Sequence, residues 1–234
     1  MKKNASKREK IQRQVELFRA ALDDAAASIE RGEKVKVTIS RGNIKMGVIP
    51  SVSRLPLLTC PSCCKDTCAG DCYAAKLTSL RPSVLKSWAR NTAAAFYAPD
   101  VFWGAVDKAM KKARFFRFHV SGDIVSRRDF RHIVDAARNN PHCQVLAFTK
   151  AFRVVNSFID TDGPLPQNMH VLFSGWQNLT PDNPHCLPET NVIMPGAEVP
   201  KNWTVCTGNC YECAVNGRGC WTAGAGETIA FHKH

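Results

Sequence analysis

The feature that most constrains this chain is a run of five cysteines within the thirteen residues from Cys60 to Cys72. A buried structural cysteine behaves as a small apolar residue and needs no cysteine neighbours. Clustered thiolates are instead what a soft metal ion or an iron–sulfur cluster requires. A second group follows near the other end of the chain and comprises Cys206, Cys210, Cys213 and Cys220. We therefore expect two inorganic centres, with the chain between them forming the scaffold that brings them together.

The length of the chain favours a single domain over residues 1–234. Within it we expect an N-terminal helical segment over 1–33 and an α/β core over 34–205 that carries the cysteine loop 60–72. A C-terminal segment over 206–234 is expected to bind the second centre. The chain has eleven cysteines. In a reducing compartment this number argues against a disulfide framework.

The distribution of apolar and charged residues indicates where the protein works. No apolar run reaches the ~18 residues of a membrane span, and none follows the basic N-terminus MKKNASKREK. We therefore expect no membrane span, no secretory signal and a cytoplasmic location. The formal net charge of +12 stays basic after allowance for metal centres, which favours an anionic partner. The simpler interpretation is that surface lysines only provide solubility.

Strand-like and helix-like segments alternate through most of the chain. An amphipathic helix is expected over 6–31, followed by a β-hairpin with strands over 34–40 and 43–49. Further helices are expected over 82–97, 101–113, 126–139 and up to about Ile159, with strands over 115–121, 144–149, 169–174, 191–194, 203–206 and 228–232. This alternation predicts an α/β fold with a largely parallel sheet. The later strands lack clear helices, which argues against a closed eightfold barrel.

The strand expected over 115–121 is the most informative one. Phe116, Phe118 and Val120 fall on one face, and Arg117, His119 and Ser121 fall on the other. An apolar face packed on helices and a polar face turned inward are typical of a barrel strand that lines a site. The simpler alternatives are that His119 is a hydrogen-bonded interior residue and that Arg117 pairs with Asp123.

Polar residues follow several of the expected strands. Sites in parallel α/β folds collect at the C-terminal ends of the strands. The segments expected at this edge are Ser121-Gly122-Asp123, Thr149-Lys150, Ser174-Gly175-Trp176 and Cys206. We therefore expect the functional site to lie at this edge of the sheet.

The second cysteine group has a C-x3-C-x2-C spacing from Cys206 to Cys213, and Cys220 follows it. Four thiolates held by short loops suit either a tetrahedral zinc ion or a [4Fe–4S] cube. Zinc sites favour two C-x2-C knuckles, and the segment has one. We therefore favour an iron–sulfur centre over a zinc ribbon.

The first group has more cysteines than the four that one cube needs, namely Cys60, Cys63, Cys64, Cys68 and Cys72. The adjacent Cys63 and Cys64 can hardly both bind one centre in good geometry, so at least one of them is expected to be spare. Cys143 and Cys186 stand alone in the sequence. We interpret these two as buried or incidental thiols.

The run CPSCCKDTCAGDCYAAK from Cys60, the segments FHVSGD and FTK, and the tail CTGNCYECAVNGRGCW…GETIAFHKH resemble a phage and bacterial family known as gene product eighty-eight. The resemblance covers about residues 40–234. It implies that the family's recurrent cysteines correspond to Cys60, Cys68, Cys72, Cys206, Cys210, Cys213 and Cys220. Cys63 and Cys64 fall outside this pattern, which leaves the ligand set of the first centre open.

A more distant similarity is to radical S-adenosylmethionine (SAM) enzymes, carried by Cys68, Cys72 and the Ser121-Gly122-Asp123 segment. It implies a partial (β/α)6-type barrel in which three cysteines leave one iron of a [4Fe–4S] cluster open. In those enzymes a glycine-rich acidic motif after the second strand binds the amino group of SAM. The first group departs from the family spacing C-x3-C-x2-C, because its pattern is Cys60-x7-Cys68-x3-Cys72.

The leading functional hypothesis is a radical-SAM-like redox enzyme with an open-site cluster, an auxiliary cluster at Cys206 and an electron donor such as ferredoxin or flavodoxin. The residues expected to be catalytic are Arg117, His119, Asp123 and Lys150. Those expected to bind the small-molecule cofactor are Ser121, Gly122, Asp123, Ser174 and Gln177.

The alternative hypothesis is a protein that binds or processes nucleic acid and uses structural iron–sulfur or zinc centres. Its support is the basic charge together with Lys7, Arg8, Lys10 and Arg13 at the start of the first helix. No known DNA-binding motif accompanies them, and a metal-dependent nuclease would need several clustered carboxylates that this chain lacks.

Overall fold

The computed structural model describes residues 6–233, so that residues 1–5 of the basic N-terminal segment and His234 lie outside the described part. Its centre is one seven-stranded sheet in the order β1-β2-β3-β4-β5-β7-β6. Every pair of neighbouring strands is parallel. The strands are β1 Ser51–Val52, β2 Phe115–Phe118, β3 Gln144–Thr149, β4 Met169–Ser174, β5 Glu189–Ile193, β6 Trp203–Val205 and β7 Thr228–His232. The predicted α/β fold is confirmed, and the sheet is parallel throughout.

Seven α-helices and three short 3₁₀ turns surround the sheet in residues 6–233. The α-helices are α1 Lys7–Glu30, α2 Tyr73–Leu80, α3 Pro82–Tyr97, α4 Pro99–Met110, α5 Arg127–Asn139, α6 Phe152–Asp162 and α7 Cys210–Val215. The 3₁₀ turns are η1 Ser62–Cys64, η2 Ala69–Asp71 and η3 Gly219–Trp221. Within the same residues, no helix combines the length and apolar composition that crossing a membrane requires.

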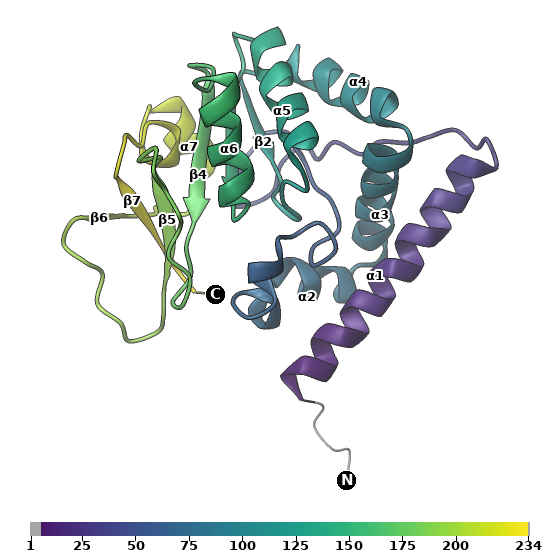
Figure 1. The fold of residues 1–234 in the computed structure, drawn as a ribbon, viewed down its shortest axis with the longest axis horizontal. Coiled ribbons are helices and arrows are strands. Elements are labelled where there is room, and N and C mark those ends of the chain that lie inside the picture. Colours follow the sequence, from purple (N-terminus) through teal and green to yellow (C-terminus); the bar gives the residue numbers. More distant parts are fainter. Residues whose placement is uncertain (1–5, 234) are drawn as a thin grey trace.

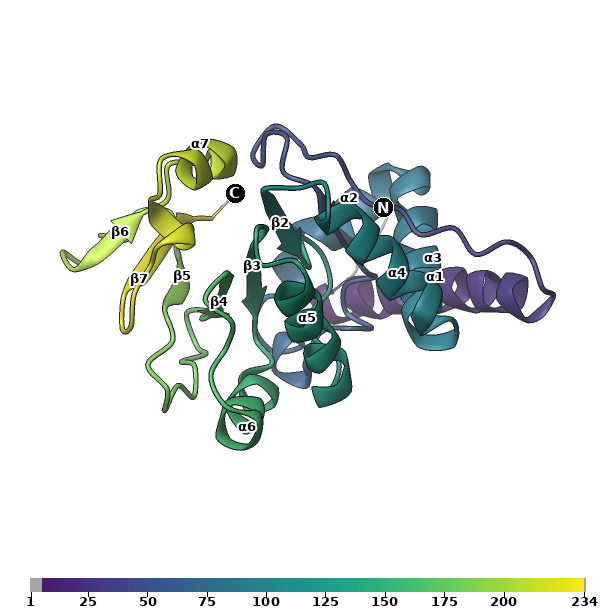
Figure 2. The same ribbon diagram turned by 90° about the horizontal axis from the view of Figure 1, so that it is seen from above.

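One face of the sheet packs against α4, α5 and α6, which Figures 1 and 2 show lying together on that side of the strands. The side chains at this interface are apolar and almost fully buried. They include Phe116 and Phe118 of β2, Phe102 of α4, Phe130 of α5 and Phe158 of α6. This is the main hydrophobic core, and its burial provides much of the driving force for folding.

The opposite face of the sheet is covered by two irregular segments. Met46 and Ile49 come from the loop before β1, and Cys213 and Trp221 come from the segment between β6 and β7. These side chains pack with residues of β2, β3, β4 and β7 in a second apolar cluster. Figure 2 shows α7 on this side of the strands, away from α5 and α6. The second cysteine group therefore lies against the sheet.

Helices α1 and α3 form a separate layer and run side by side in Figure 1. Ser6 caps α1 and forms a capping box with Glu9, as the preference for Ser at this position predicts. Phe18 of α1 packs with Ala89 and Ala93 of α3, and the half-buried Cys72 packs against the same cluster. The α1–α3 layer therefore supports the first cysteine loop.

The predicted hairpin over 34–49 is wrong. Thr38 makes its backbone hydrogen bonds with the side chain of Asn91 on α3, while Ser40 pairs with Ser51 in an isolated antiparallel bridge. The segment over 34–49 therefore forms hydrogen bonds with α3 and β1. It crosses the molecule, and we call it the strap. Residues 43–47 close a tight loop in which Asn43 N–H donates to the Gly47 carbonyl over 3.1 Å.

Three other expectations need adjustment. The strand predicted over 115–121 ends at Phe118, because His119 has a φ of +50° that breaks the extended backbone. The two-residue strand β1 was not predicted, since its neighbours Pro50 and Pro56 obscured it. The helix predicted over 101–113 is α4, which begins at Pro99 and ends at Met110.

Asn91 holds the strap and β1 to α3 and is 1% exposed. Its amide donates to the carbonyls of Thr38 (2.9 Å) and Ser53 (3.0 Å) and accepts from Thr38 N–H (2.7 Å). We expect Asn91→Ala to lower the free energy of unfolding by about 3 kcal/mol, because buried backbone groups lose their partners. Urea denaturation under anaerobic conditions measures this. The exposed Asn139 at the end of α5 provides the control, since Asn139→Ala should change stability by less than about 0.5 kcal/mol. Equal effects at the two positions would contradict this role of Asn91.

Candidate metal centres at one cavity

A cavity of about 550 Å³ lies where the strands end. Its wall contains residues that follow β2, β3, β4 and β6, because parallel strands deliver their C-terminal loops to one edge of the sheet. Cysteines of both groups line this wall: Cys60, Cys64, Cys68, Cys72, Cys206, Cys210, Cys213 and Cys220. The two cysteine groups, far apart in the sequence, thus face one shared space.

The first cysteine loop follows β1 and folds through two 3₁₀ turns, η1 and η2. The neighbouring thiols of Cys60 and Cys68 raise the pKa of Cys64, while Cys64 lowers the pKa of Cys68. Burial raises the pKa of Cys72 to about 11. The four cysteines at four-residue steps therefore form one group of thiols.

Cys63 and Cys64 differ in their placement. Cys64 is 4% exposed and borders the cavity. Cys63 does not line it, and its sulfur lies 4.0 Å from the backbone carbonyl of Lys150. Cys64 therefore borders the cavity together with Cys60, Cys68 and Cys72, whereas Cys63 does not.

The second group is held by short local contacts around α7. Cys206 Sγ accepts from Gly208 N–H (3.4 Å), and the Thr207 hydroxyl lies 3.2 Å from Cys213 Sγ. Burial raises the pKa of Cys220 to about 12, so that without a nearby cation this thiol stays protonated at neutral pH. A metal centre supplies the positive charge that thiolates in such a setting require.

The strap before β1 fixes the start of α7. The Cys210 N–H donates to the Lys45 carbonyl over 2.9 Å. Gly47, with a φ of +62°, passes so close to Tyr211 that a Cβ at this position would lie 2.6 Å from the Tyr211 Cβ. Only glycine tolerates both the backbone conformation and this approach.

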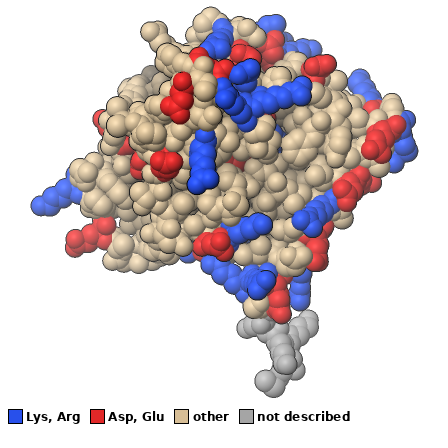
Figure 3. Space-filling model, viewed as in Figure 1, with Lys and Arg blue, Asp and Glu red and all other residues tan. Residues whose placement is uncertain are grey.

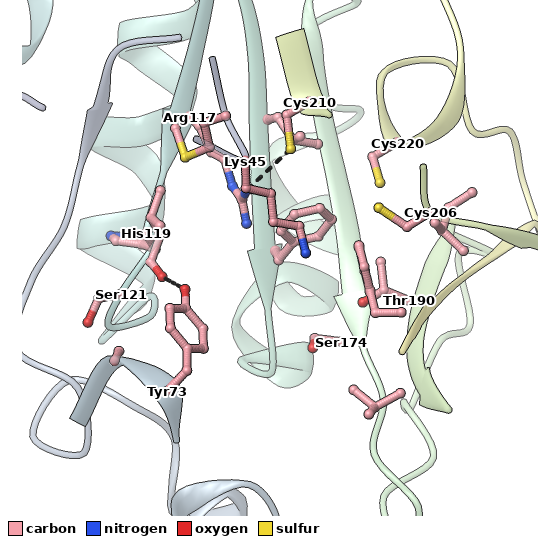
Figure 4. A pocket seen from close by; sticks show the side chains of 18 of the residues that line it. Lys45, Tyr73, Arg117, His119, Ser121, Ser174, Thr190, Cys206, Cys210 and Cys220 are labelled. Carbon is pink, nitrogen blue, oxygen red and sulfur yellow. Dashed lines mark hydrogen bonds between the residues drawn. The ribbon is translucent and has the colours of Figure 1, made fainter. Parts of the chain in front are cut away.

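Arg117 projects from β2 into the space between the groups, as the strand pattern predicted. Its Nη1 lies 3.8 Å from Cys210 Sγ, and its guanidinium carbon stacks 4.6 Å from the centre of the Phe148 ring. Figure 4 shows Lys45 beside Arg117 in the middle of the cavity, with Tyr73 on one side and Cys206 and Cys220 on the other. Arg117 therefore contacts a cysteine and does not pair with Asp123.

Tyr73 follows Cys72 directly and begins α2. Its hydroxyl donates to the Val120 carbonyl at the end of β2. The side chain is 58% exposed, but this exposure is to a cavity surrounded by protein, and burial raises the pKa of the phenol. Negative charge at Cys72, Cys60 or Cys210 would raise the pKa of the phenol further. Tyr73 thus lines the cavity on the side opposite Cys206 and Cys220 (Figure 4).

Ser121, Gly122 and Asp123 border the cavity at the end of β2, where the sequence placed them. Their polar atoms are engaged within the protein. Ser121 Oγ donates to the Arg54 carbonyl, and a Cβ on Gly122, whose φ is +79°, would lie 2.5 Å from Thr59 Oγ1. This segment is therefore packed tightly against the loop that leads to Cys60.

The Asp123 carboxylate ties the ends of β2 and β3 together. It accepts hydrogen bonds from the Thr149 hydroxyl (2.5 Å), Ile124 N–H (2.7 Å) and Lys150 N–H (2.8 Å). Burial nevertheless raises its pKa above the usual range. Both carboxylate oxygens therefore accept hydrogen bonds from the chain itself.

Lys150 and Ser174 meet at the cavity wall, because Lys150 Nζ donates to the Ser174 carbonyl and hydroxyl, each at 2.7 Å. The Lys150 ammonium also lies 5.9 Å from the centre of the Trp176 ring. Gln177, expected to bind the cofactor, is exposed and does not line the cavity. Trp176 occupies the wall instead, since the turn after β4 directs this side chain inward.

His119 borders the cavity, but its ring is directed away from Lys45 and Arg117 in Figure 4. Its Nε2 lies 2.6 Å from Nη2 of the fully buried Arg54, which donates to both oxygens of Asp129 at 2.9 and 2.8 Å. The positive φ at His119 turns the ring toward this buried group. His119 is therefore a hydrogen-bonded interior residue, and its predicted catalytic role does not fit this placement.

The donor sets fit iron–sulfur clusters in number and chemistry. Each group brings four cysteines to the cavity, and cubic [4Fe–4S] clusters are held by four thiolates. Among residues 6–233, no three His, Cys, Asp or Glu side chains converge closely enough to chelate a single metal ion.

The fold and the site together define a parallel α/β protein with two cysteine groups at one cavity. The chain belongs to the gene product 88 family, whose sequence model matches residues 16–222. No curated protein and no solved structure matches the chain. The predicted family is confirmed, while the more distant similarity to radical SAM enzymes stays a prediction.

Sequence reasoning left the role of Cys64 open and did not assign Tyr73 or Lys45 to this cavity. The four-residue steps of the first group favour Cys64, and Tyr73 directly follows Cys72. Lys45 had no such signal, because it lies in the segment that was predicted to be a hairpin. Its approach to Cys210 depends on the folded strap.

The buried His119 makes stability depend on pH. Burial, with a smaller contribution from Arg54, lowers the pKa of His119 in the folded protein well below the usual 6.5. At a pH between this lowered pKa and about 6.5, the unfolded chain binds more protons than the folded one. We expect the free energy of unfolding to fall as the pH drops below about 6.5, by up to about 1.4 kcal/mol per pH unit for this group. His119→Gln keeps a hydrogen-bond acceptor for Arg54 but does not titrate in this range. The free energy of unfolding of this variant should therefore fall less as the pH drops. Urea denaturation from pH 7 to 5 compares the two proteins, and parallel curves would refute the assignment.

Proposed function

We propose that this protein is an iron–sulfur redox enzyme that carries one [4Fe–4S] cluster at each cysteine group and acts on a small molecule in the cavity between them. The observation that carries this proposal is that cysteines of both groups line one cavity. Two centres that only stabilise the fold would not need to line the same cavity.

The donor set favours iron over zinc. All eight side chains are cysteines, which are the usual ligands of [4Fe–4S] clusters. Zinc in structural sites is commonly bound by paired C-x2-C knuckles, whereas the first group repeats at four-residue steps. When bound, such clusters supply one-electron transfer to a molecule in the cavity.

The chain's own residues would bind and shield that molecule. The cavity wall is largely apolar, with Leu146, Phe148 and Phe231 on the sheet side, and such a wall excludes water. Lys150, held by Ser174, presents a fixed positive charge at the strand ends. Tyr73 would position a ligand between the two groups. This combination suits a small organic molecule with an anionic group.

The protein's basic charge suits an acidic one-electron donor of the ferredoxin or flavodoxin type. Figure 3 shows Lys and Arg interleaved with Asp and Glu over the face in view, so the excess positive charge is not gathered into one patch there. A nucleic-acid partner is supported by the net charge and by the basic residues Lys7, Arg8, Lys10 and Arg13 at the start of α1.

A second candidate is SAM cleavage at the first cluster, favoured by one observation. The cysteine loop follows β1 and Ser121-Gly122-Asp123 follows β2, so both lie at the same edge of the sheet. This candidate requires that Cys64 is not a ligand, because four thiolates leave no iron open. It also requires the amino group of SAM to reach the Asp123 carboxylate, which already accepts three hydrogen bonds from the chain.

The proposal predicts about eight iron atoms and as many acid-labile sulfides per chain after anaerobic purification. The protein should be brown and should bleach in air. Iron and sulfide assays with an absorption spectrum measure this. A colourless protein with stoichiometric zinc, even after anaerobic reconstitution, would contradict the proposal.

The placement of Cys64 predicts a difference between two adjacent cysteines. Cys64→Ala should remove up to half of the iron, because it deletes a thiol that faces the cavity, whereas Cys63→Ala should leave the iron content unchanged. Iron assays and electron paramagnetic resonance (EPR) of the reduced proteins measure this, with circular dichroism as the check on folding. Full iron in Cys64→Ala would instead indicate three ligands and an open iron. In that case addition of SAM should perturb the EPR signal of the first cluster.

A further inference from the structure

Arg117 carries a charge that the protein does not neutralise with a carboxylate. None of the ion pairs among residues 6–233 involves Arg117. Its Nε is buried without a hydrogen-bond partner, and its Nη1 points at Cys210 Sγ. A half-buried guanidinium without a counter-ion is costly. The feature that compensates Arg117 is therefore expected to be negative charge on the second cysteine group.

Lys45 adds a second charge at the same cysteine. Its backbone carbonyl accepts from Cys210 N–H, and its ammonium lies 5.2 Å from the centre of the Phe231 ring. The ion pairs of the described residues do not include Lys45 either. The charges of Arg117 and Lys45 both act on Cys210.

The first group lacks an equivalent pair. Lys150 lies near Cys68, but its ammonium is already bound by the carbonyls of Ser174 and Gly175 and by the Ser174 hydroxyl. Lys233, which also borders the cavity, is paired with Asp71. Lys150 and Lys233 thus donate to other groups of the protein, whereas Arg117 directs its Nη1 at a cysteine sulfur of the second group.

We propose that Arg117, supported by Lys45, raises the reduction potential of the cluster at Cys206, Cys210, Cys213 and Cys220, so that this cluster accepts an electron before the first one does. The inference rests on the proposed function, since it requires a cluster at the second group. An added electron increases the negative charge on the cluster sulfurs. A hydrogen bond and a positive charge at a ligand sulfur stabilise that reduced state, the more so in a cavity of low dielectric.

The redox step is a transfer of one electron without a proton. A donor of the ferredoxin or flavodoxin class loses one electron, and the second cluster goes from its oxidised to its reduced state. No bond forms or breaks. Arg117 contacts the ligand sulfur of Cys210, and through this contact it sets the order in which the clusters are reduced.

The test is an EPR-monitored redox titration of the anaerobic full-length protein and four variants. Cys213→Ala removes the second cluster and so identifies its signal. Arg117→Gln should make reduction of that cluster about tenfold less favourable, a shift of about 59 mV to more negative potential for a one-electron couple. Lys45→Gln should shift it in the same direction by less. The first cluster should titrate unchanged in Arg117→Gln and Lys45→Gln.

Arg114→Gln provides the matched control. Arg114 directly precedes β2 and is exposed, and its guanidinium stacks on Phe115 at 5.1 Å without contacting a cysteine. Its removal deletes the same charge and should leave both potentials unchanged. If Arg117→Gln fails to fold, Arg117→Lys tests the same point, because it keeps the charge and should retain most of the potential.

Two results would overturn the inference. One is an unchanged potential of the second cluster in Arg117→Gln and Lys45→Gln proteins that contain full iron. The other is a wild-type titration in which the first cluster is reduced at the higher potential. A wild-type protein without any cluster would instead refute the proposed function, so the two failures are distinguishable by iron assay.

Discussion

The strands of this protein all run in one direction, and the site depends on this constraint. Parallel strands send the loops that follow them to a single edge of the sheet. The first cysteine loop leaves β1 at this edge, and Cys206 leaves β6 there. Strand β7 then inserts between β5 and β6, so the segment from Cys206 to Cys220 must cross back over the sheet. Two cysteine groups more than 130 residues apart are thereby brought to one cavity.

The cavity also shows how the protein manages charge in a buried setting. Thiolates are unfavourable among apolar side chains, and burial raises the pKa of Cys72 to about 11 and of Cys220 to about 12. Metal centres would supply most of the positive charge that these ligands need. Arg117 and Lys45 supply more of it at the second group alone. The two groups therefore resemble each other in donor chemistry but differ in electrostatic environment, which is what an ordered transfer of electrons requires.

Much of the fold was predictable because its signals are local. Strands β3, β4 and β7 and helix α3 follow directly from hydrophobic period and from Pro82 at a helix start. The hairpin prediction for the strap failed because the hydrogen-bond partners of this segment include Asn91, which is far from it in the sequence, and Ser51 of β1. In the site, the density of cysteines predicted both groups, but Gln177 lies outside the cavity and the ring of His119 turns toward Arg54. Their side-chain directions depend on a turn and on a left-handed residue that alternation alone does not predict.

The central claim is that two iron–sulfur clusters face one cavity. Anaerobic crystals of the full-length protein, measured with X-rays on either side of the iron absorption edge, test it most directly. The account predicts two separate groups of iron anomalous peaks. One should lie among Cys60, Cys64, Cys68 and Cys72, and the other among Cys206, Cys210, Cys213 and Cys220, with Arg117 between them beside the second. A single zinc peak, or iron at only one group while the other cysteines remain free, would contradict the account.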